Sequence, residues 1–156
     1  MLVNTLTPSS PPARPVPGSS QGENDQGIDP VELRILLIED SVLLQKRLTD
    51  MLTLAGVMRV TGTAATEPEA RERIDTGEYD VLVVDVELGK GSGIGAIGHA
   101  RQRYSDRQPL IIVLTNFPLP AVRSLCLAAG ADHFLDKMRQ FQEVRPLIAA
   151  LKRPPR

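Results

Sequence analysis

The chain has 156 residues, with 18 lysines and arginines against 19 aspartates and glutamates, so its formal net charge is -1. This length allows one domain with a substantial core plus a tail, and the balanced charge argues against a broad surface for nucleic acids or anionic membranes. The single cysteine, Cys126, excludes an internal disulfide framework, and the two histidines, His99 and His133, lie too far apart in sequence to indicate a zinc-type cluster.

The first thirty residues differ in composition from the rest of the chain. They contain six prolines and two pairs of serines, and they show no apolar periodicity that could build a core. We therefore predict a disordered tail over 1–30 and a domain over 31–153. The opening MLVNTLTPSS has neither a basic start nor a long apolar run, and no later run reaches the roughly 18 apolar residues of a membrane span. These features predict a cytoplasmic protein without membrane insertion.

From residue 31 the chain alternates between strand-like and helix-like segments. The run LRILLIED (33–40) is continuously apolar before its two acids, which is typical of a strand buried on both faces of a parallel sheet. A helix follows, with Ser41 as its expected N-cap and Gly56 as its expected end. Its apolar positions recur at helical spacing: Leu44, Leu48, Met51, Leu52 and Ala55.

The middle of the chain repeats this alternation. Residues 57–64 (VMRVTGTA) predict a weaker strand at a sheet edge, and residues 66–77 predict a helix capped by Thr66, with proline and glutamate in its first turn. The apolar run DVLVVD (80–85) predicts the third strand. The glycine-rich stretch after it leads into a helix that runs to about Tyr104.

The last third contains two more strand–helix pairs. Residues 109–116 (PLIIVLTN) predict the fourth strand, and residues 131–137 (ADHFLDK) predict the fifth. The helix between them, 120–130, should place one apolar face on the core: Val122, Leu125, Cys126 and Ala129. In the final helix Pro146 either makes a kink or belongs to the first turn. The apolar residues in register there are Phe141, Val144, Ile148 and Leu151.

Five such repeats predict an α/β fold with helices on both faces of a parallel sheet, because a parallel strand can return only by a right-handed crossover. In sheets of this kind the functional site forms outside the carboxyl ends of the strands. Polar groups close four of the five predicted strands: Glu39 and Asp40, Asp85, Thr115 and Asn116, Asp136 and Lys137. These strand ends converge on one edge of the sheet.

Three carboxylates gathered at one edge would repel each other unless a cation lay among them, and oxygen ligands at a partly open site suit Mg²⁺. A nearby lysine and a hydroxyl are what a phosphoryl group would need. Lys137 and the metal would neutralise charge on its oxygens, and Thr115 would donate a hydrogen bond. A carboxylate could then attack phosphorus as the nucleophile. These residues predict phosphoryl-transfer chemistry.

The glycine run offers a competing interpretation, a nucleotide site. Gly93, Gly95 and Gly98 fit the dinucleotide-binding spacing G-x-G-x-x-G. In that motif the first glycine turns directly off the strand, and an acid about 20 residues later holds the ribose. Gly93 instead lies eight residues after Asp85, and the next strand ends in Thr115. We therefore interpret the run as a loop leading into a glycine-diluted helix, without a nucleotide cofactor.

At these positions the sequence resembles the receiver domains of bacterial two-component response regulators. The resemblance covers about 33–152. It rests on the acid pair at 39–40, Asp85 closing VLVVD, L-x-x-G-S-G-I at 88–94, Thr115 closing IIVLT, A-G-A-D at 129–132 and Lys137 after FLD. It implies the flavodoxin-like (βα)5 receiver fold, a five-stranded doubly wound parallel sheet with strand order 2-1-3-4-5.

The resemblance also implies a role for each residue of the site. Asp85 is expected to be the phosphoacceptor, and Lys137 is expected to bridge to the phosphoryl group. Asp40 and Asp85 are expected to bind Mg²⁺ together with the backbone carbonyl of Glu87. Glu39 is expected to assist in holding the metal.

By the same resemblance, Thr115 and Phe134 are the switch pair that reorients when the acceptor is modified. The reorientation would change the surface formed by the fourth helix, the last two strands and the fifth helix. Two positions depart from the family pattern, since Asn116 replaces a very small residue and Met138 replaces a proline. Two further side chains are expected at the rim of the site, where they would alter the lifetime of the phosphorylated form: Glu87 and Phe117.

The expected function is a phosphoryl-accepting switch in two-component signalling, not an enzyme acting on a separate substrate. The implied partners are a sensor histidine kinase or histidine phosphotransfer protein, and an unknown downstream protein; homodimer formation stays open. Only residues 153–156 follow the final helix, so a stand-alone receiver is expected. Two alternatives remain open: a degenerate receiver that binds its partner without phosphorylation, and a small dinucleotide-binding oxidoreductase.

Overall fold

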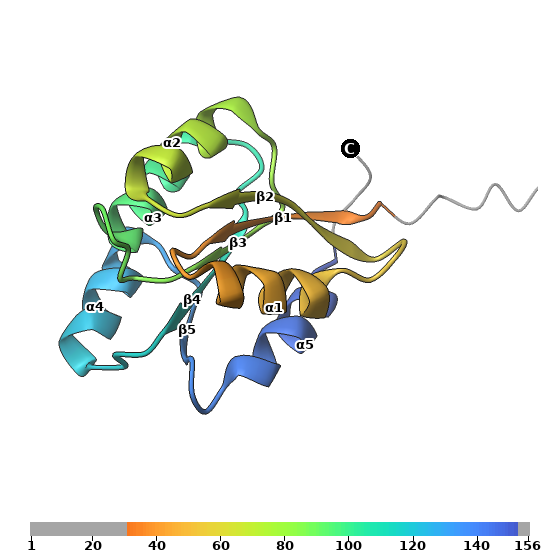
Figure 1. Ribbon diagram of the computed structural model, residues 1–156. Coiled ribbons are helices and arrows are strands. Elements are labelled where there is room, and N and C mark those ends of the chain that lie inside the picture. Colours follow the sequence, from red (N-terminus) through yellow and green to blue (C-terminus); the bar gives the residue numbers. More distant parts are fainter. Residues whose placement is uncertain (1–30, 153–156) are drawn as a thin grey trace, which may run out of the picture.

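The computed structural model describes residues 31–152, which form a three-layer α/β domain (Figure 1). The strands are β1 (Leu33–Ile38), β2 (Met58–Ala64), β3 (Val81–Val84), β4 (Leu110–Thr115) and β5 (His133–Asp136). The helices are α1 (Val42–Leu52), α2 (Glu67–Thr76), α3 (Gly93–Arg103), α4 (Pro120–Ala129) and α5 (Val144–Ala149), the last preceded by the 3-10 turn η1 (Phe141–Glu143). The tail predicted over 1–30 lies outside the described residues.

The five strands form one parallel sheet in the order β2-β1-β3-β4-β5, which confirms the predicted fold. β2 lies at an edge of the sheet, as predicted. The chain moves outward from β1 to β2 and then crosses back to β3, so the winding direction switches between β1 and β3. The crevice outside the carboxyl ends of these two strands is where doubly wound sheets bind ligands.

Apolar side chains fill both faces of the sheet. Figure 1 shows α1 and α5 on one face and α2, α3 and α4 on the other. Alternate residues of β1 and β3 belong to two separate core clusters, Leu36, Ile38, Leu82 and Val84 on one face and Ile35, Leu37, Val81 and Val83 on the other. Burial on both faces explains the continuous apolar runs in the sequence. No helix within residues 31–152 is long and apolar enough to span a bilayer.

Both predicted N-caps are present. Ser41 Oγ accepts a hydrogen bond from the Leu44 N–H at 3.3 Å, and Thr66 Oγ1 accepts one from the Glu69 N–H at 3.3 Å. Glu69 reaches back in turn, because its Oε2 accepts from the Ala65 N–H at 2.7 Å. These contacts begin α1 and α2 at the residues that the sequence indicated.

The predicted end of the first helix at Gly56 is wrong, because α1 ends at Leu52. The chain turns sharply afterwards, and the backbones of Leu54 and Met58 hydrogen-bond to each other in both directions. Gly56 has a φ of 73° within this turn, and Ala55 is exposed instead of buried. The glycine does mark a left-handed backbone position, but that position belongs to the turn and not to the helix end.

The last two helices differ in detail from the prediction. In α4, Cys126 is buried as predicted, but Leu125 is 57% exposed. The final helical segment is divided into η1 and α5, and Pro146 is the third residue of α5. Of the two alternatives for this proline, the first turn is therefore correct, since a missing N–H there breaks no helical hydrogen bond.

Candidate functional site

Three charged side chains from different strand ends meet at the carboxyl edge of the sheet. Glu39 follows β1, Asp85 follows β3 and Lys137 follows β5. The Lys137 ammonium donates to Glu39 Oε2 and to Asp85 Oδ2, each at 2.8 Å. All three residues are buried, with between 3% and 7% of their surface exposed. The structure therefore brings together the side chains whose convergence the strand pattern predicted.

Asp40 adds a third carboxylate to this group. Carboxylate oxygens of Glu39, Asp40 and Asp85 all lie within 4.8 Å of one another, and Asp40 is exposed, so the group opens to solvent on that side. Three carboxylates against the single ammonium of Lys137 leave two negative charges. A divalent cation that prefers oxygen ligands would balance them, so these residues fit Mg²⁺.

Burial opposes the charged form of the groups in the site. It raises the pKa of the Glu39 carboxyl above its usual value, although hydrogen bonds from Lys137 and from the Ser41 N–H act in the opposite direction. Burial alone would lower the pKa of Lys137, but its hydrogen bonds to Asp85 and Glu39 outweigh that effect and raise it. The lysine therefore stays protonated at neutral pH, and a further cation would favour the ionised form of Glu39.

The loop after β3 contacts the second oxygen of Asp85. The Glu87 N–H donates to Asp85 Oδ1 at 3.3 Å, so the Glu87 backbone lies beside the acidic group. Behind it, the first residue of α3 is Gly93, and a Cβ there would come within 2.0 Å of the Asp85 backbone oxygen. Close packing of the helix start against the chain after β3 thus explains this glycine without a nucleotide.

Thr115 closes β4 next to the strand that carries the lysine. Its side chain is fully buried, its Oγ1 accepts from the Phe117 N–H at 3.2 Å, and its carbonyl accepts from the Lys137 N–H at 2.8 Å. Phe117 itself is 49% exposed, so this aromatic ring lies at the surface of the β4–α4 connection. The hydrogen bond between the two backbones fixes the position of the Lys137 backbone relative to Thr115.

Phe134 points into the core and not into solvent. Only 8% of its surface is exposed, and the Arg123 guanidinium lies 5.8 Å from the centre of its ring. In the β4–β5 pairing, Val113 lies opposite Phe134 and Thr115 lies opposite Asp136. Since side chains alternate along a strand, Thr115 and Phe134 face the same side of the sheet in neighbouring strands.

Residues 35–149 match the family model described as "Response regulator receiver domain". The chain belongs to this receiver family. Among solved structures, it is similar to the receiver domain of the sensor histidine kinase PA1611 from Pseudomonas aeruginosa, which has a magnesium ion coordinated in its active site cleft. The identity is 30%, the TM-score is 0.65, and the match covers 75% of this chain and 94% of that one. The response regulator domain of Thermotoga maritima CheB, at 24% identity and a TM-score of 0.65, supports the fold over 75% of this chain and 90% of its own.

Curated relatives of the receiver are longer proteins. A protein-glutamate methylesterase/protein-glutamine glutaminase of Dechloromonas aromatica is 32% identical over 70% of this chain, which corresponds to 31% of the relative. The response regulator protein PmrA of Pseudomonas aeruginosa is 32% identical over 78% of this chain and 53% of its own length. The chain thus spans about a third to a half of the length of these relatives.

The loop after β5 holds the receiver's lysine in place without a proline. Asp136 Oδ1 accepts hydrogen bonds from the Met138 N–H at 2.8 Å and from the Arg139 N–H at 3.3 Å. Gln140 Oε1 accepts from the Asp136 N–H at 2.9 Å, so the loop is closed on both sides of Lys137. Asp136 was predictable only as a strand-end acid, and Gln140 was not predictable because its contact with Asp136 depends on the folded loop.

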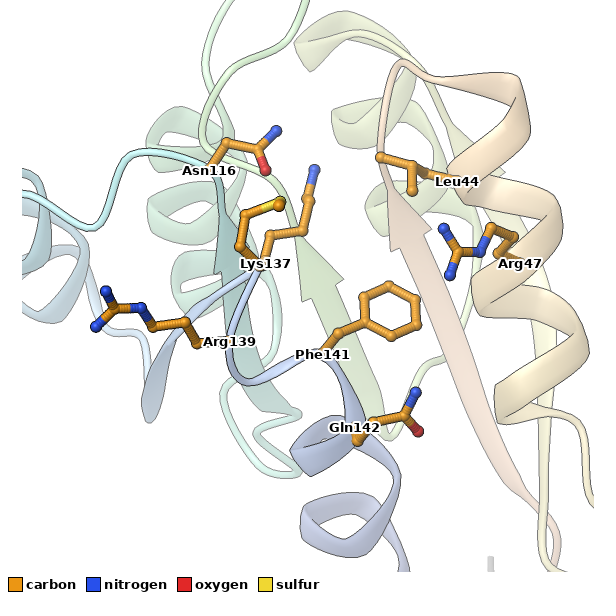
Figure 2. A pocket seen from close by; sticks show the side chains of 8 residues that line it. Leu44, Arg47, Asn116, Lys137, Arg139, Phe141 and Gln142 are labelled. Atoms are coloured by element: carbon orange, nitrogen blue, oxygen red, sulfur yellow. The ribbon is translucent and has the colours of Figure 1, made fainter.

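A cavity of about 540 Å³ lies between α1 and this loop, beside the receiver's acidic group (Figure 2). Its lining carries positive and amide groups but no carboxylate: Leu44, Arg47, Asn116, Lys137, Met138, Arg139, Phe141 and Gln142. Figure 2 shows Arg47 of α1 facing Phe141. The Arg47 guanidinium lies 5.4 Å from the centre of the Phe141 ring. This pair could not be predicted from the sequence, because the two residues are distant in the chain and meet only in the folded protein.

Proposed function

We propose that this receiver accepts a phosphoryl group on Asp85 and changes its affinity for a partner protein in response. The observation that carries the proposal is the buried lysine that joins Glu39 and Asp85 next to an exposed third acid. Such a group is costly to bury for structural purposes alone, since a buried ion pair adds little stability relative to apolar residues. Its position at the strand ends, open to solvent beside Asp40, suits a reaction with an incoming anion.

In the proposed reaction an oxygen of the Asp85 carboxylate attacks phosphorus. The new O–P bond forms as the bond from phosphorus to the donor's histidine nitrogen breaks, and that nitrogen keeps the electron pair. The Lys137 ammonium is already within hydrogen-bond distance of Asp85 and would pair with the phosphoryl oxygens. The Thr115 hydroxyl would donate a hydrogen bond to the same group once it turns away from the Phe117 N–H.

Mg²⁺ would offset the negative charge that gathers during this transfer. The side chains of Asp40 and Asp85 would hold it, with the backbone carbonyl of Glu87 as a further ligand and Glu39 assisting. Support comes from the excess of two negative charges and from the spacing of the three carboxylates. The position of the Glu87 backbone beside Asp85 also supports this ligand set.

The proposed donor is a histidine kinase or a histidine phosphotransfer protein. The cavity between α1 and the loop after β5 leads from the surface to Lys137, and Arg47 and Arg139 give it positive charge. A donor that presents acidic groups next to its phosphohistidine would therefore be favoured there. The response would begin with Thr115 and Phe134 and reach the surface of α4, β4, β5 and α5, where the downstream partner would bind.

Intact-protein mass spectrometry tests the acceptor directly. With Mg²⁺ and acetyl phosphate, the wild-type chain should gain one phosphoryl mass that is lost at alkaline pH, and EDTA should prevent the gain. Asp85→Asn should remove it, because an amide cannot serve as the nucleophile. Asp50→Asn, which changes an exposed acid of α1 outside the site, should label like the wild type.

Two results would redirect the assignment. A phosphoryl gain in the Asp85→Asn chain would place the acceptor on another residue. If the wild type takes up no phosphoryl group from acetyl phosphate or from any kinase, the chain acts as a binding module that does not require phosphorylation.

A further inference from the structure

Glu67, the first residue of α2, connects that helix to the loop between β3 and α3. Its Oε2 accepts a hydrogen bond from the Ser92 N–H at 2.8 Å, and its own N–H donates to the Lys90 carbonyl at 3.0 Å. Its Oε1 accepts from the Arg71 guanidinium through Nε at 3.1 Å and Nη2 at 2.9 Å. The Ser92 N–H, followed by Arg71, lowers the pKa of the Glu67 carboxyl. Both oxygens are therefore used, one by the helix and one by the loop.

Two positions in the glycine run are shaped by this carboxylate. A Cβ on Gly95 would come within 2.1 Å of Glu67 Oε1, and a Cβ on Gly91 would come within 2.4 Å of Glu67 Cβ. Gly91 also has a φ of 81°, a left-handed conformation that favours glycine. Both backbone segments thus pack directly against the Glu67 side chain, Gly91 against its Cβ and Gly95 against its carboxylate.

The arginine that pairs with Glu67 is itself held from the other side. Arg71 Nη1 lies 3.2 Å from His99 Nδ1, and His99 Nε2 lies 2.8 Å from Asp75 Oδ1. His99 of α3 thus contacts two residues of α2 that lie one helical turn apart. These contacts fix the guanidinium in the orientation that meets Glu67, which limits how far the carboxylate can move away from Ser92.

The loop that Glu67 holds is the one that contacts Asp85. Ser92 forms an antiparallel bridge with Glu87, and the Glu87 N–H donates to Asp85 Oδ1 at 3.3 Å. A continuous set of contacts thus runs from Arg71 through Glu67 and the loop to the acidic group. We propose that Glu67 is a positioning residue of the phosphoacceptor site, whose carboxylate keeps the Glu87 backbone beside Asp85. This inference rests on the function proposed above.

The test compares loop protection with metal affinity in the unphosphorylated full chain. Glu67→Ala should abolish the hydrogen-exchange protection of the Ser92 amide, read by NMR. It should also weaken Mg²⁺ binding, titrated by calorimetry, by about tenfold, as loss of a group supporting a metal ligand does elsewhere. Glu67→Gln keeps an acceptor for the Ser92 N–H but loses the charge facing Arg71. Its Mg²⁺ affinity should therefore lie between that of the wild type and that of Glu67→Ala.

Glu69→Ala is the matched control, since Glu69 lies in the same helical turn but, among the described residues, accepts only from the Ala65 N–H at the helix start. It should leave the Ser92 amide and the Mg²⁺ affinity unchanged. Arg71→Ala should weaken Mg²⁺ binding in the wild-type background but add nothing to Glu67→Ala, because it acts through that carboxylate.

The outcomes separate a positioning role from a structural one. If Glu67→Ala frees the Ser92 amide but binds Mg²⁺ like the wild type, or if Glu69→Ala weakens binding equally, the positioning role is refuted. Labelling of wild-type Asp85 is scored separately with acetyl phosphate. If the wild type is labelled but Glu67→Ala keeps wild-type Mg²⁺ affinity, only the positioning role of Glu67 is refuted. If the wild type neither binds Mg²⁺ nor becomes labelled, the proposed function is refuted as well.

Discussion

The buried lysine pairs with two of the three carboxylates of the site. Lys137 is the only cation in contact with the carboxylates of Glu39 and Asp85 within the described residues, and all three side chains are shielded from water. Replacing one partner of a buried ionic group leaves a buried charge without a counter-charge. The resulting loss in the free energy of unfolding is larger than the stability that the intact group contributes. Removing this side chain should therefore destabilise the resting fold, and in the proposed function the same ammonium would pair with the phosphoryl oxygens.

Replacing this lysine should destabilise the fold in a way that a divalent cation relieves. In EDTA at neutral pH, Lys137→Ala should lower the free energy of unfolding by about 3 kcal/mol, measured by urea denaturation. Mg²⁺ should recover part of that loss and should stabilise the variant more than the wild type, because it replaces the missing positive charge. Lys46→Ala, at an exposed pair with Asp50, should change stability by less than about 0.5 kcal/mol. Equal effects of Mg²⁺ on the wild type and Lys137→Ala would contradict this account.

Tyr104 offers a test of burial away from the site. Burial, followed by the nearby Glu78 charge, raises the pKa of its hydroxyl from the usual 10.0 to about 12. Its hydroxyl donates to the carbonyls of Ile74 and Gly77, at 3.2 Å and 2.9 Å. Since the folded chain favours the neutral phenol, its contribution is complete below pH 10 and is lost as the pH rises towards 12.

Tyr104→Phe should accordingly lower the free energy of unfolding by about 1–2 kcal/mol at pH 7. The difference between wild type and variant should shrink when urea denaturation is repeated at stepwise higher pH between 10 and 12. A difference that stays constant over this interval would mean that the phenol is not held neutral by the fold.

At the scale of single residues, the sequence indicated the side chains that chemistry requires at strand ends. Asp85 and Lys137 could be identified because each directly follows a strand-like run, and the structure brings them together. Glu67 and Gln140 could not be identified this way. Their roles depend on loops that approach them only in the folded chain, and neither leaves a periodic or spaced signal in the sequence.

At the scale of secondary structure, two glycines of α3 have opposite roles, one at the start of the helix and one in its middle. Gly93 packs against the Asp85 backbone oxygen, whereas a Cβ on Gly98 would meet nothing within 4 Å. Gly98→Ala should therefore raise the free energy of unfolding by about 0.5–1 kcal/mol, because alanine favours a helix interior over glycine. Gly93→Ala should lower it by several times that amount, roughly 2 kcal/mol or more, because the backbone near Asp85 must move. Both values can be measured by urea denaturation.

Changes of opposite sign in the free energy of unfolding for Gly98→Ala and Gly93→Ala would support a packing role of the glycine run over a nucleotide-binding role. If the run held a nucleotide, both substitutions should weaken saturable NAD binding in calorimetry. Their effects on the free energy of unfolding would then not need to have opposite signs. A stabilising Gly93→Ala would show that the close approach to Asp85 is not required.

The helix ends illustrate which element boundaries a sequence can predict. Ser41 and Thr66 begin their helices as predicted, because capping depends on residues three positions away. The end of α1 was misplaced because Gly56 satisfies two different structures, a helix C-cap and a tight turn, and only the pairing of Leu54 with Met58 decides between them. The predicted ends at Gly77 and Gly130 are the C-caps of α2 and α4, so the error is confined to the glycine that also suits a tight turn.

At the scale of the whole molecule, the strand order could be predicted because the βα pattern repeats five times and right-handed crossovers leave few arrangements. The split of the last helical segment and the cavity between α1 and the loop after β5 could not, since both depend on side-chain packing between distant segments. The parts of the site that depend on strand order could therefore be predicted, whereas the parts that depend on side-chain packing between distant segments could not.

Both hydrophobic cores are built from residues between 33 and 151, which leads to a prediction for the first thirty residues. Their high proline and serine content gives them little apolar surface to bury. A chain that begins at Val31 should keep its free energy of unfolding within about 1 kcal/mol of the full chain, measured by urea denaturation. It should also gain the same phosphoryl mass from acetyl phosphate, because every proposed site residue lies after Val31. A loss of several kcal/mol would show that the first thirty residues pack on the domain, and a loss of labelling with unchanged stability would show that they contribute to the site itself.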